Sequence, residues 1–145
     1  KEIILPKSVT AIEAYAFYGF QTLSQIAVPE SVTTIGEHAF GNCRKLRRIA
    51  ILEGVTVIGR QAFSGCKSLT AITVPEGVRT IAYGSFEECG RLVEVSLPES
   101  VTKIEKCAFQ GCRTLRSIAI PGRKTAMLRV APEGCPVKVI SIAVN

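Results

Sequence analysis

The stretch IAVPESVTTIGEHAFGNCRKLRR, residues 26–48, is followed directly by IAILEGVTVIGRQAFSGCKSLTA, residues 49–71. The second stretch repeats the first at the same spacing, and the pattern returns from Ile72 and again from Val95. A fixed period of this length predicts a repeat architecture, in which each unit is one small structural element that is stable only when it is stacked on its neighbours.

Four columns of residues share the spacing of 23 positions. Phe occupies positions 17, 40, 63, 86 and 109, and Leu occupies 23, 46, 69, 92 and 115. Pro occupies 6, 29, 75, 98 and 121, with Leu52 in the missing place, and Cys occupies 43, 66, 89, 112 and 135. The spacing predicts a single domain over residues 1–145, with about five full repeats over 3–117 and a degenerate C-terminal capping repeat over 118–145.

Each unit opens with a short strand. The pattern I-x-V, as at Ile26 and Val28, alternates apolar residues and is typical of a strand with one buried face. The proline that follows cannot donate a ladder hydrogen bond, so it ends the strand. The next apolar pair, Val32 and Ile35 in the second unit, predicts a short extended or turn segment.

The rest of each unit predicts one or two helical turns. In the second unit the remaining apolar residues are Ala39, Phe40, Cys43 and Leu46. Steps of three to four residues between them suit a helix that faces the core. The residue before the cysteine column is Gly or Asn in most units, and both tolerate the left-handed conformation after a helix end. Glu88 departs from this pattern and is expected to be strained or to turn differently.

The units together predict an α/β solenoid, with short parallel strands on one face and short helices or turns on the other. Parallel strands would stack about 4.8 Å apart. Because strands stack more closely than helical turns, we expect the solenoid to be curved, with its strands on the concave face.

The unit LPxxVxxIxxxAFxxCxxL resembles the BspA-like, treponemal-type leucine-rich repeat, over about residues 3–122. The resemblance implies a right-handed horseshoe of the kind found in bacterial surface and secreted proteins, often linked to attachment to host components or to other cells. The departures are Leu52 for Pro, Phe20 for the first Cys, Ser85 for Ala, and Pro132 and Lys138 in the last unit. That unit is expected to act as a cap, in which VKVISIAV, residues 137–144, closes the end of the sheet.

The five cysteines of the repeat column are expected to form a ladder of buried free thiols that pack as small apolar side chains. Their Cα atoms would lie within disulfide reach, but parallel Cβ vectors oppose a bridge. The sequence contains no C-x-x-C pair, so a zinc site is disfavoured. Cys107 lies instead in a column of mixed polarity with Tyr15, His38, Gln61 and Gly84, so we expect it to be partly exposed. Whether its thiol is reactive or bridges two chains stays open, and His38 is expected to be a surface residue rather than a ligand.

Strand residues that point away from the core would line the concave face. These candidate partner-binding residues are Gln25, Ala27, Arg48, Ala50, Leu52, Ala71, Thr73, Glu94 and Ser96. They form a small-residued, sparsely charged surface of the kind that binds proteins. The alternative is that small side chains only keep a curved face uncrowded.

Charge is segregated on the two flanks of the strands. A row of Glu30, Glu53, Glu76 and Glu99 follows them, and Arg44, Lys45, Arg47, Lys67, Arg91, Arg113 and Arg116 precede them. Both rows solubilise the edges, or the basic row meets an acidic partner. Nucleic acid is disfavoured, because the Phe and Tyr residues fall mostly in core columns and leave no aromatic platform for bases.

The composition argues against an enzyme. The chain has a net charge of +6, no Asp and one His, and it carries no phosphate-binding loop, GxSxG elbow or HExxH motif. No cofactor or metal is expected. The sequence contains no run of 18 or more apolar residues, so it predicts no membrane span. The opening Lys1-Glu2 leads directly into the first repeat, which suggests a mature or trimmed fragment.

The sequence therefore predicts a protein-binding module of a bacterial surface or secreted protein, acting in adhesion to a host, extracellular-matrix or cell-surface component. The expected location is the cell surface, the periplasm or the medium. The alternative is a self-associating structural or periplasmic scaffold, a homo-oligomer in which the exposed strand at Ile3 pairs with a second copy.

Overall fold

The computed structural model describes residues 1–121, 129–130 and 140–142, and it is built from strands and turns. The longer strands are β1 (Glu2–Ile4), β3 (Gln25–Val28), β5 (Arg48–Ile51), β7 (Ala71–Thr73), β9 (Glu94–Ser96), β11 (Ser117–Pro121) and β13 (Ile140–Ile142). The shorter strands are β2 (Ala11–Ile12), β4 (Thr34–Ile35), β6 (Val57–Ile58), β8 (Thr80–Ile81), β10 (Lys103–Ile104) and β12 (Arg129–Val130). We name the five successive 23-residue segments from residue 1 to residue 115 coils 1 to 5.

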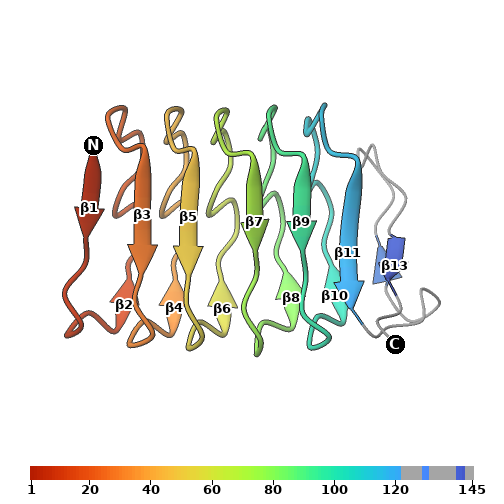
Figure 1. Cartoon of the computed structure of the whole chain (residues 1–145), viewed down its shortest axis with the longest axis horizontal. Helices are drawn as coiled ribbons and strands as arrows, with labels where there is room; N and C mark the ends of the chain where they lie inside the picture. The colour runs from red at the N-terminus through yellow and green to blue at the C-terminus, as the bar shows by residue number, and fades with distance from the viewer. Residues whose placement is uncertain (122–128, 131–139, 143–145) are drawn as a thin grey trace.

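The coils stack in a single row with their strands parallel (Figure 1). Ile26 of β3 pairs with Ile49 of β5, and Thr34 of β4 pairs with Val57 of β6, so partners are 23 residues apart. The predicted stacking of equivalent residues is therefore confirmed. After coil 5 the offset changes: Lys103 pairs with Arg129, and Ala119 with Ile140.

The C-terminal prediction is covered only in part by the described residues. Strand β13, within the VKVISIAV stretch, pairs with β11 at the end of its sheet, and the capping role of this stretch stays a prediction. Pro132, Cys135 and Lys138, on which the rest of that prediction depends, lie outside the described residues.

The predicted helices are wrong: the described residues form no helix, and the convex side of each coil is a series of turns. In coil 1, the N–H groups of Ala16 and Tyr18 donate to carbonyls three residues earlier, Glu13 and Tyr15. The N–H of Phe17, between them, donates instead to the carbonyl of Ala39 in coil 2, over 2.8 Å. Every second N–H therefore joins two coils, whereas a helix would use all of them internally.

Left-handed residues explain why the apolar spacing does not produce a helix. Tyr15, His38, Gln61, Gly84 and Cys107 share one column, and all have φ between 51° and 61°. The residue four positions later is also left-handed in each coil, with φ between 57° and 73°. Glu88 belongs to this second column and adopts the same turn as its glycine counterparts, at φ 57°. Two such residues leave only three right-handed positions between them, too few for a helical turn.

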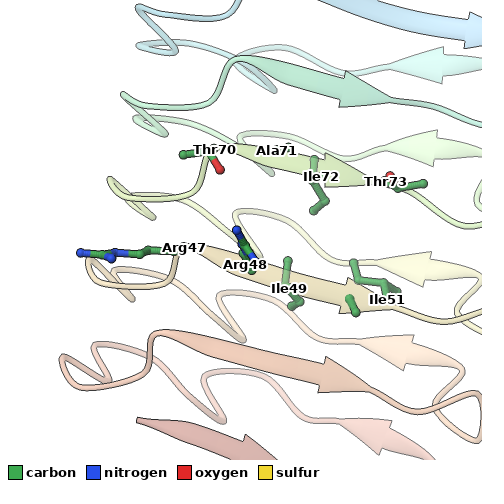
Figure 2. Close-up of a pocket in the computed structure, with 9 residues that line it drawn as sticks. Arg47, Arg48, Ile49, Ile51, Thr70, Ala71, Ile72 and Thr73 are labelled. Carbon is green, nitrogen blue, oxygen red and sulfur yellow. The ribbon is translucent and has the colours of Figure 1, made fainter.

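The stack is interrupted between coils 3 and 4. The longer strands form one sheet of β1, β3 and β5 and another of β7, β9, β11 and β13, and the shorter strands divide at the same junction. Figure 1 shows β5 and β7 farther apart than the neighbouring strands, and the close-up in Figure 2 shows the space between them. We call this junction, along both rows of strands, the seam.

Hydrogen bonds at the adjacent junctions identify what the seam lacks. Arg47 N–H donates to the Ser24 carbonyl over 2.8 Å, and Val93 N–H donates to Thr70 over 2.8 Å, but no bond joins Thr70 N–H to Arg47. On the convex side the coils stay joined, since Gln61 N–H donates to Tyr83 over 2.9 Å. The seam is therefore open along the strands and closed along the convex turns.

A single column of small residues gives a physical reason for the seam. A Cβ atom added to Gly36 would lie 2.5 Å from Ala14 N, and one added to Gly59 would lie 2.7 Å from Glu37 N, closer than Cβ atoms come to backbone. Ala82 holds this position in coil 4. Its methyl group therefore keeps coil 4 from approaching coil 3 as closely as coils 2 and 3 approach their predecessors.

Two other substitutions act at or beside the seam. Thr33 and Thr102 donate side-chain hydrogen bonds to the preceding coil, at 3.3 Å and 3.2 Å, and Arg79 replaces the threonine at the seam. Glu105 follows Ala82 in the glycine column, yet coil 5 stays paired with coil 4. Its carboxylate accepts a hydrogen bond from Tyr83 N–H at 2.9 Å, a contact that alanine cannot make.

The core runs without interruption through all the coils. Phe17, Phe40, Phe63, Phe86 and Phe109 stack with ring centroids 5.1 to 5.5 Å apart and nearly parallel planes. The pair across the seam, Phe63 and Phe86, is separated by 5.5 Å, and the pairs on either side of it by 5.4 Å. The predicted Phe spine is confirmed, and the seam lies in the backbone edges and not in the core.

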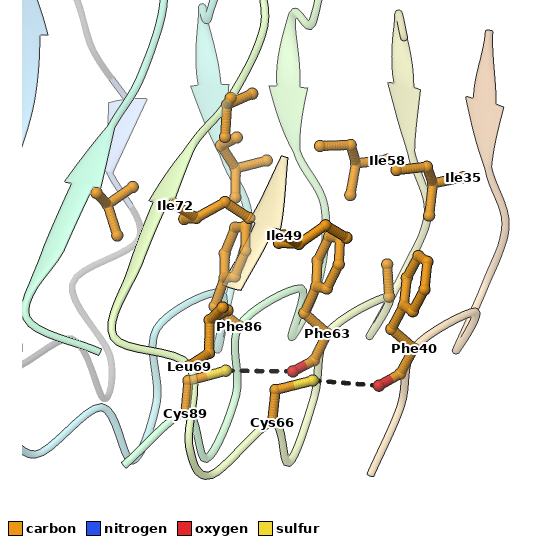
Figure 3. Close-up of a cluster of buried hydrophobic side chains, with 14 of the residues drawn as sticks. Ile35, Phe40, Ile49, Ile58, Phe63, Cys66, Leu69, Ile72, Phe86 and Cys89 are labelled. Carbon is orange, nitrogen blue, oxygen red and sulfur yellow. Dashed lines mark hydrogen bonds between the residues drawn. The ribbon is translucent and has the colours of Figure 1, made fainter. Parts of the chain in front are cut away.

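The cysteine ladder is confirmed for the described residues, with one addition. Cys43, Cys66, Cys89 and Cys112 are buried thiols. Each thiol also donates a hydrogen bond to the carbonyl of the Phe 26 residues earlier, over 3.0 to 3.2 Å. Figure 3 shows two of these bonds, from Cys66 and Cys89. The thiols therefore join consecutive coils as well as filling space.

We expect Ala82→Gly to close the seam, because it removes the methyl group that holds coil 4 away from coil 3. Hydrogen exchange should slow at the amides of Arg79 and Ala82, which would gain partners in coil 3. The matched control is Gly59→Ala, which should accelerate exchange between coils 2 and 3 and lower the free energy of unfolding. Unchanged exchange in Ala82→Gly would show that Ala82 is not what keeps the seam open.

The thiol ladder predicts a pH dependence of stability. Burial raises the pKa of Cys43 from its usual 9.0 to about 11, and burial also raises the pKa of Cys66 and Cys89. A thiol whose pKa is raised by folding stabilises the fold fully below pH 9 and loses that contribution as the pH rises through about 11. The stability advantage of the wild type over Cys43→Ala, measured by urea unfolding, should therefore shrink from about pH 8 to about pH 10.5. A constant difference would contradict this prediction.

Candidate functional site

The side of the longer strands that faces solvent carries the predicted partner-binding residues, and we call it the strand face. Gln25, Ala27, Arg48, Ala50, Ala71, Thr73 and Glu94 are exposed, Ser96 is half-buried, and Leu52 is 48% exposed at the end of β5. The structure thus brings all nine residues to one side of the molecule. Whether they contact a partner stays a prediction.

Strand pairing arranges these residues in two rows across the coils. Gln25 pairs with Arg48 in one row, and Ala27 pairs with Ala50 in the other. The second row also begins with Ile4, which is 84% exposed on β1. The strand face therefore has a row of polar and charged groups beside a row of small or apolar ones.

Leu52 has a role in pairing that its sequence position did not reveal. It replaces proline, so it keeps an N–H, and this group donates to the Val28 carbonyl over 3.2 Å. The leucine therefore adds a backbone bond between coils 2 and 3, while its side chain adds apolar surface at the edge of the strand face.

A groove of about 630 Å³ follows the seam on the strand face. Its walls are Arg47–Ile51 on coil 3 and Thr70–Thr73 on coil 4. Figure 2 shows the Arg48 side chain in the space between β5 and β7, while Arg47 extends away from it. Four of the predicted residues, Arg48, Ala50, Ala71 and Thr73, lie in this groove, so the seam crosses the middle of the predicted site.

A second hollow, of about 820 Å³, lies at the same junction on the side of the shorter strands. Thr56 and Arg60 of coil 3 and Arg79 and Thr80 of coil 4 are among its lining residues. No sequence motif marks either groove. The signals that could have located them are the departures from the repeat at Arg79 and Ala82.

The electrostatics of the groove are basic. Among the described residues the ion pairs are Lys103 with Glu105, at 3.0 Å, and His38 with Glu37, at 3.9 Å. Neither Arg47 nor Arg48 therefore has a carboxylate partner in this part of the chain. Both guanidinium groups are exposed to solvent.

The expectation that the aromatic residues lie mostly in core columns fails for two tyrosines. Tyr15 and Tyr18 are 54% and 48% exposed, and they cluster with His38 on the convex turns of coils 1 and 2. Tyr15 stacks on His38 at 4.9 Å between centroids, and the Tyr18 hydroxyl accepts a hydrogen bond from Asn42 at 2.9 Å. The sequence repeat hid this cluster, because Tyr18 stands in a column that no other unit fills with an aromatic residue.

Cys107 is half-buried and free, as its column predicted. It lies beside Tyr83: a side-chain hydrogen bond between them, with the charge on Cys107, raises the pKa of the Tyr83 phenol. The Arg60 guanidinium lies 5.1 Å from the centre of the Tyr83 ring. In the described part of the chain no cluster of three His, Cys, Asp or Glu side chains is placed to hold a metal ion.

The fold is a parallel β-solenoid of stacked 23-residue coils, with the strand face along one side. The sequence pattern of the BspA type leucine rich repeat region matches residues 1–116 and 81–144, in six copies. The chain belongs to the BspA-type leucine-rich repeat family.

Solved structures agree with this assignment. A leucine rich repeat protein of T. pallidum is 32% identical, with a TM-score of 0.82 over 98% of this chain and 68% of that one. A leucine rich cell surface protein of Faecalibacterium prausnitzii is 34% identical, with a TM-score of 0.84 over 90% of this chain but only 35% of that protein. No curated protein matches the chain. Among the described residues there is no helix long and apolar enough to cross a membrane.

Proposed function

We propose that this chain is a protein-binding module of a bacterial surface or secreted protein, and that its partner covers the strand face. The observation that carries the proposal is the second row of that face, where Ala27 and Ala50 are exposed side by side and Thr73 is exposed across the seam. Small side chains leave the strands accessible to a flat partner surface, and polar groups at the rim are typical of protein interfaces.

Two further findings support a surface or secreted role in adhesion. The F. prausnitzii relative is a cell surface protein, and it is longer than this chain. The strand face also presents Arg48, with Arg47 beside it, and among the described residues neither forms an ion pair, which suits attraction to an acidic protein surface. Extracellular-matrix or cell-surface proteins of the host are the partner class that we propose.

A second candidate function is a self-associating scaffold. Strand β1 is at the end of its sheet, and Ile4 on it is 84% exposed. A strand edge with an exposed apolar side chain can accept a further strand, from a preceding repeat or from a second copy. Light scattering over a range of concentrations separates the two functions, because a stable oligomer favours the scaffold.

We expect Ala50→Glu to abolish binding to extracellular-matrix proteins, because it places a bulky carboxylate in the middle of the small-residue row. Surface plasmon resonance with immobilised matrix proteins measures the loss. Ala50 is exposed, so the free energy of unfolding should change by less than about 0.5 kcal/mol.

The matched control is Gln110→Glu, which adds the same charge at an exposed position on the convex turns. It should bind as the wild type does. If Ala50→Glu keeps its affinity, or if both variants lose it equally, the partner does not lie on the strand face.

A further inference from the structure

We propose that the groove at the seam binds a carboxylate of the partner protein, held by Arg48 and by two backbone N–H groups of coil 4. This inference rests on the proposed function and specifies the chemistry of the partner at that surface. It follows from three observations: the hydrogen bonds that the seam leaves unmade, the position of Arg48, and the shape of the groove.

The first observation concerns two adjacent N–H groups that share one acceptor at the two junctions on either side of the seam. The Ser24 carbonyl accepts hydrogen bonds from both Arg47 N–H and Arg48 N–H, at 2.8 Å and 3.4 Å. Farther along the chain, the Thr70 carbonyl accepts from Val93 N–H and Glu94 N–H at the same two distances. A pair of neighbouring N–H groups converging on one oxygen atom is thus a regular feature of this stack.

At the seam this pair consists of the N–H groups of Thr70 and Ala71, and the Arg47 carbonyl does not reach them. Both residues line the groove, so the two donors face solvent. Successive N–H groups that converge on one point bind anionic oxygen atoms. A carboxylate oxygen placed there would accept both bonds, as the carbonyl does elsewhere in the stack.

The second observation is the cation beside these donors. Arg48 lies in the strand-face row whose next member, across the seam, is Ala71. Because alanine is small, nothing from coil 4 in that row covers the guanidinium, and Figure 2 shows the side chain in the space between β5 and β7. A guanidinium and two N–H groups on one carboxylate form charge-assisted hydrogen bonds, the strong class in proteins.

The third observation is the form of the groove, which favours a protein carboxylate. It runs along β5 and β7, with Arg47–Ile51 on one side and Thr70–Thr73 on the other, and the exposed Thr70 and Thr73 lie at its two ends. This form suits an extended acidic peptide segment. The described residues place no exposed aromatic side chain in the groove on which a nucleic-acid base could stack.

The test is a titration of the ¹⁵N-labelled protein with an acetylated and amidated deca-glutamate peptide, followed by NMR. We expect the largest shifts at the Thr70 and Ala71 amides. Arg48→Gln should weaken binding by about tenfold, the effect of losing one charge-assisted contact. The control is Arg113→Gln, which removes the same charge at an exposed position away from the groove and should change affinity by less than about twofold.

A second variant separates binding from stability. Ala82→Gly, once its amide exchange shows that the seam has closed, should bring the Arg47 carbonyl to Thr70 and Ala71 and so abolish peptide binding while the protein becomes no less stable. A variant that merely unfolded the site could not show this combination.

Several results would overturn the proposal. They are equal losses in Arg48→Gln and Arg113→Gln, shifts scattered over the basic turns, no shifts at millimolar peptide, or a single-stranded oligonucleotide of equal charge that binds the same amides more tightly. The proposed function is judged separately. If Ala50→Glu abolishes matrix binding while Arg48→Gln keeps its affinity for the peptide, the strand face stands and the carboxylate site falls.

Discussion

The structure depends on the hydrogen bonds that join one coil to the next. A single coil offers no hydrogen-bond partner of its own to many of its backbone N–H and C=O groups. On the convex side, every second N–H of the turns donates across to the following coil, as Phe17 does to Ala39. On the strand side, N–H groups just before a strand donate the opposite way, to the preceding coil, as Arg47 does to Ser24 and Val93 does to Thr70. The apolar column of Phe rings is enclosed between these two sets of bonds and stays buried in consequence.

Much of this arrangement could be predicted from the sequence, because its cause is a spacing. The period of 23 placed Phe40 under Phe63 and Cys43 under Cys66, and the alternation in each strand separated buried Ile49 from exposed Ala50. Both predictions rest on geometry that repeats in every unit. They hold because the structure pairs Ile26 with Ile49 and Ala27 with Ala50 in that same register.

The parts that could not be predicted depend on single residues and not on the period. The steps between Ala39, Phe40 and Cys43 suit a helix, and only the left-handed backbone at His38 and Asn42 excludes it. The first of the two turn columns includes Tyr15, Gln61 and Cys107, residue types that seldom adopt that conformation, so its composition did not mark a turn. The seam follows from one methyl group at Ala82, a difference from glycine that a consensus pattern treats as noise. The candidate site lies across that departure, which the repeat could not reveal.

The distribution of bonds around the seam also determines how the solenoid carries mechanical load. A tether that pulls along the row of coils stretches each junction in series, and the weakest junction yields first. Between coils 3 and 4 the convex turns and the Phe63–Phe86 stack resist that force without help from either row of strands. Under tension the chain would part there into two shorter solenoids, each still held together by its own sheets, instead of unravelling from one end.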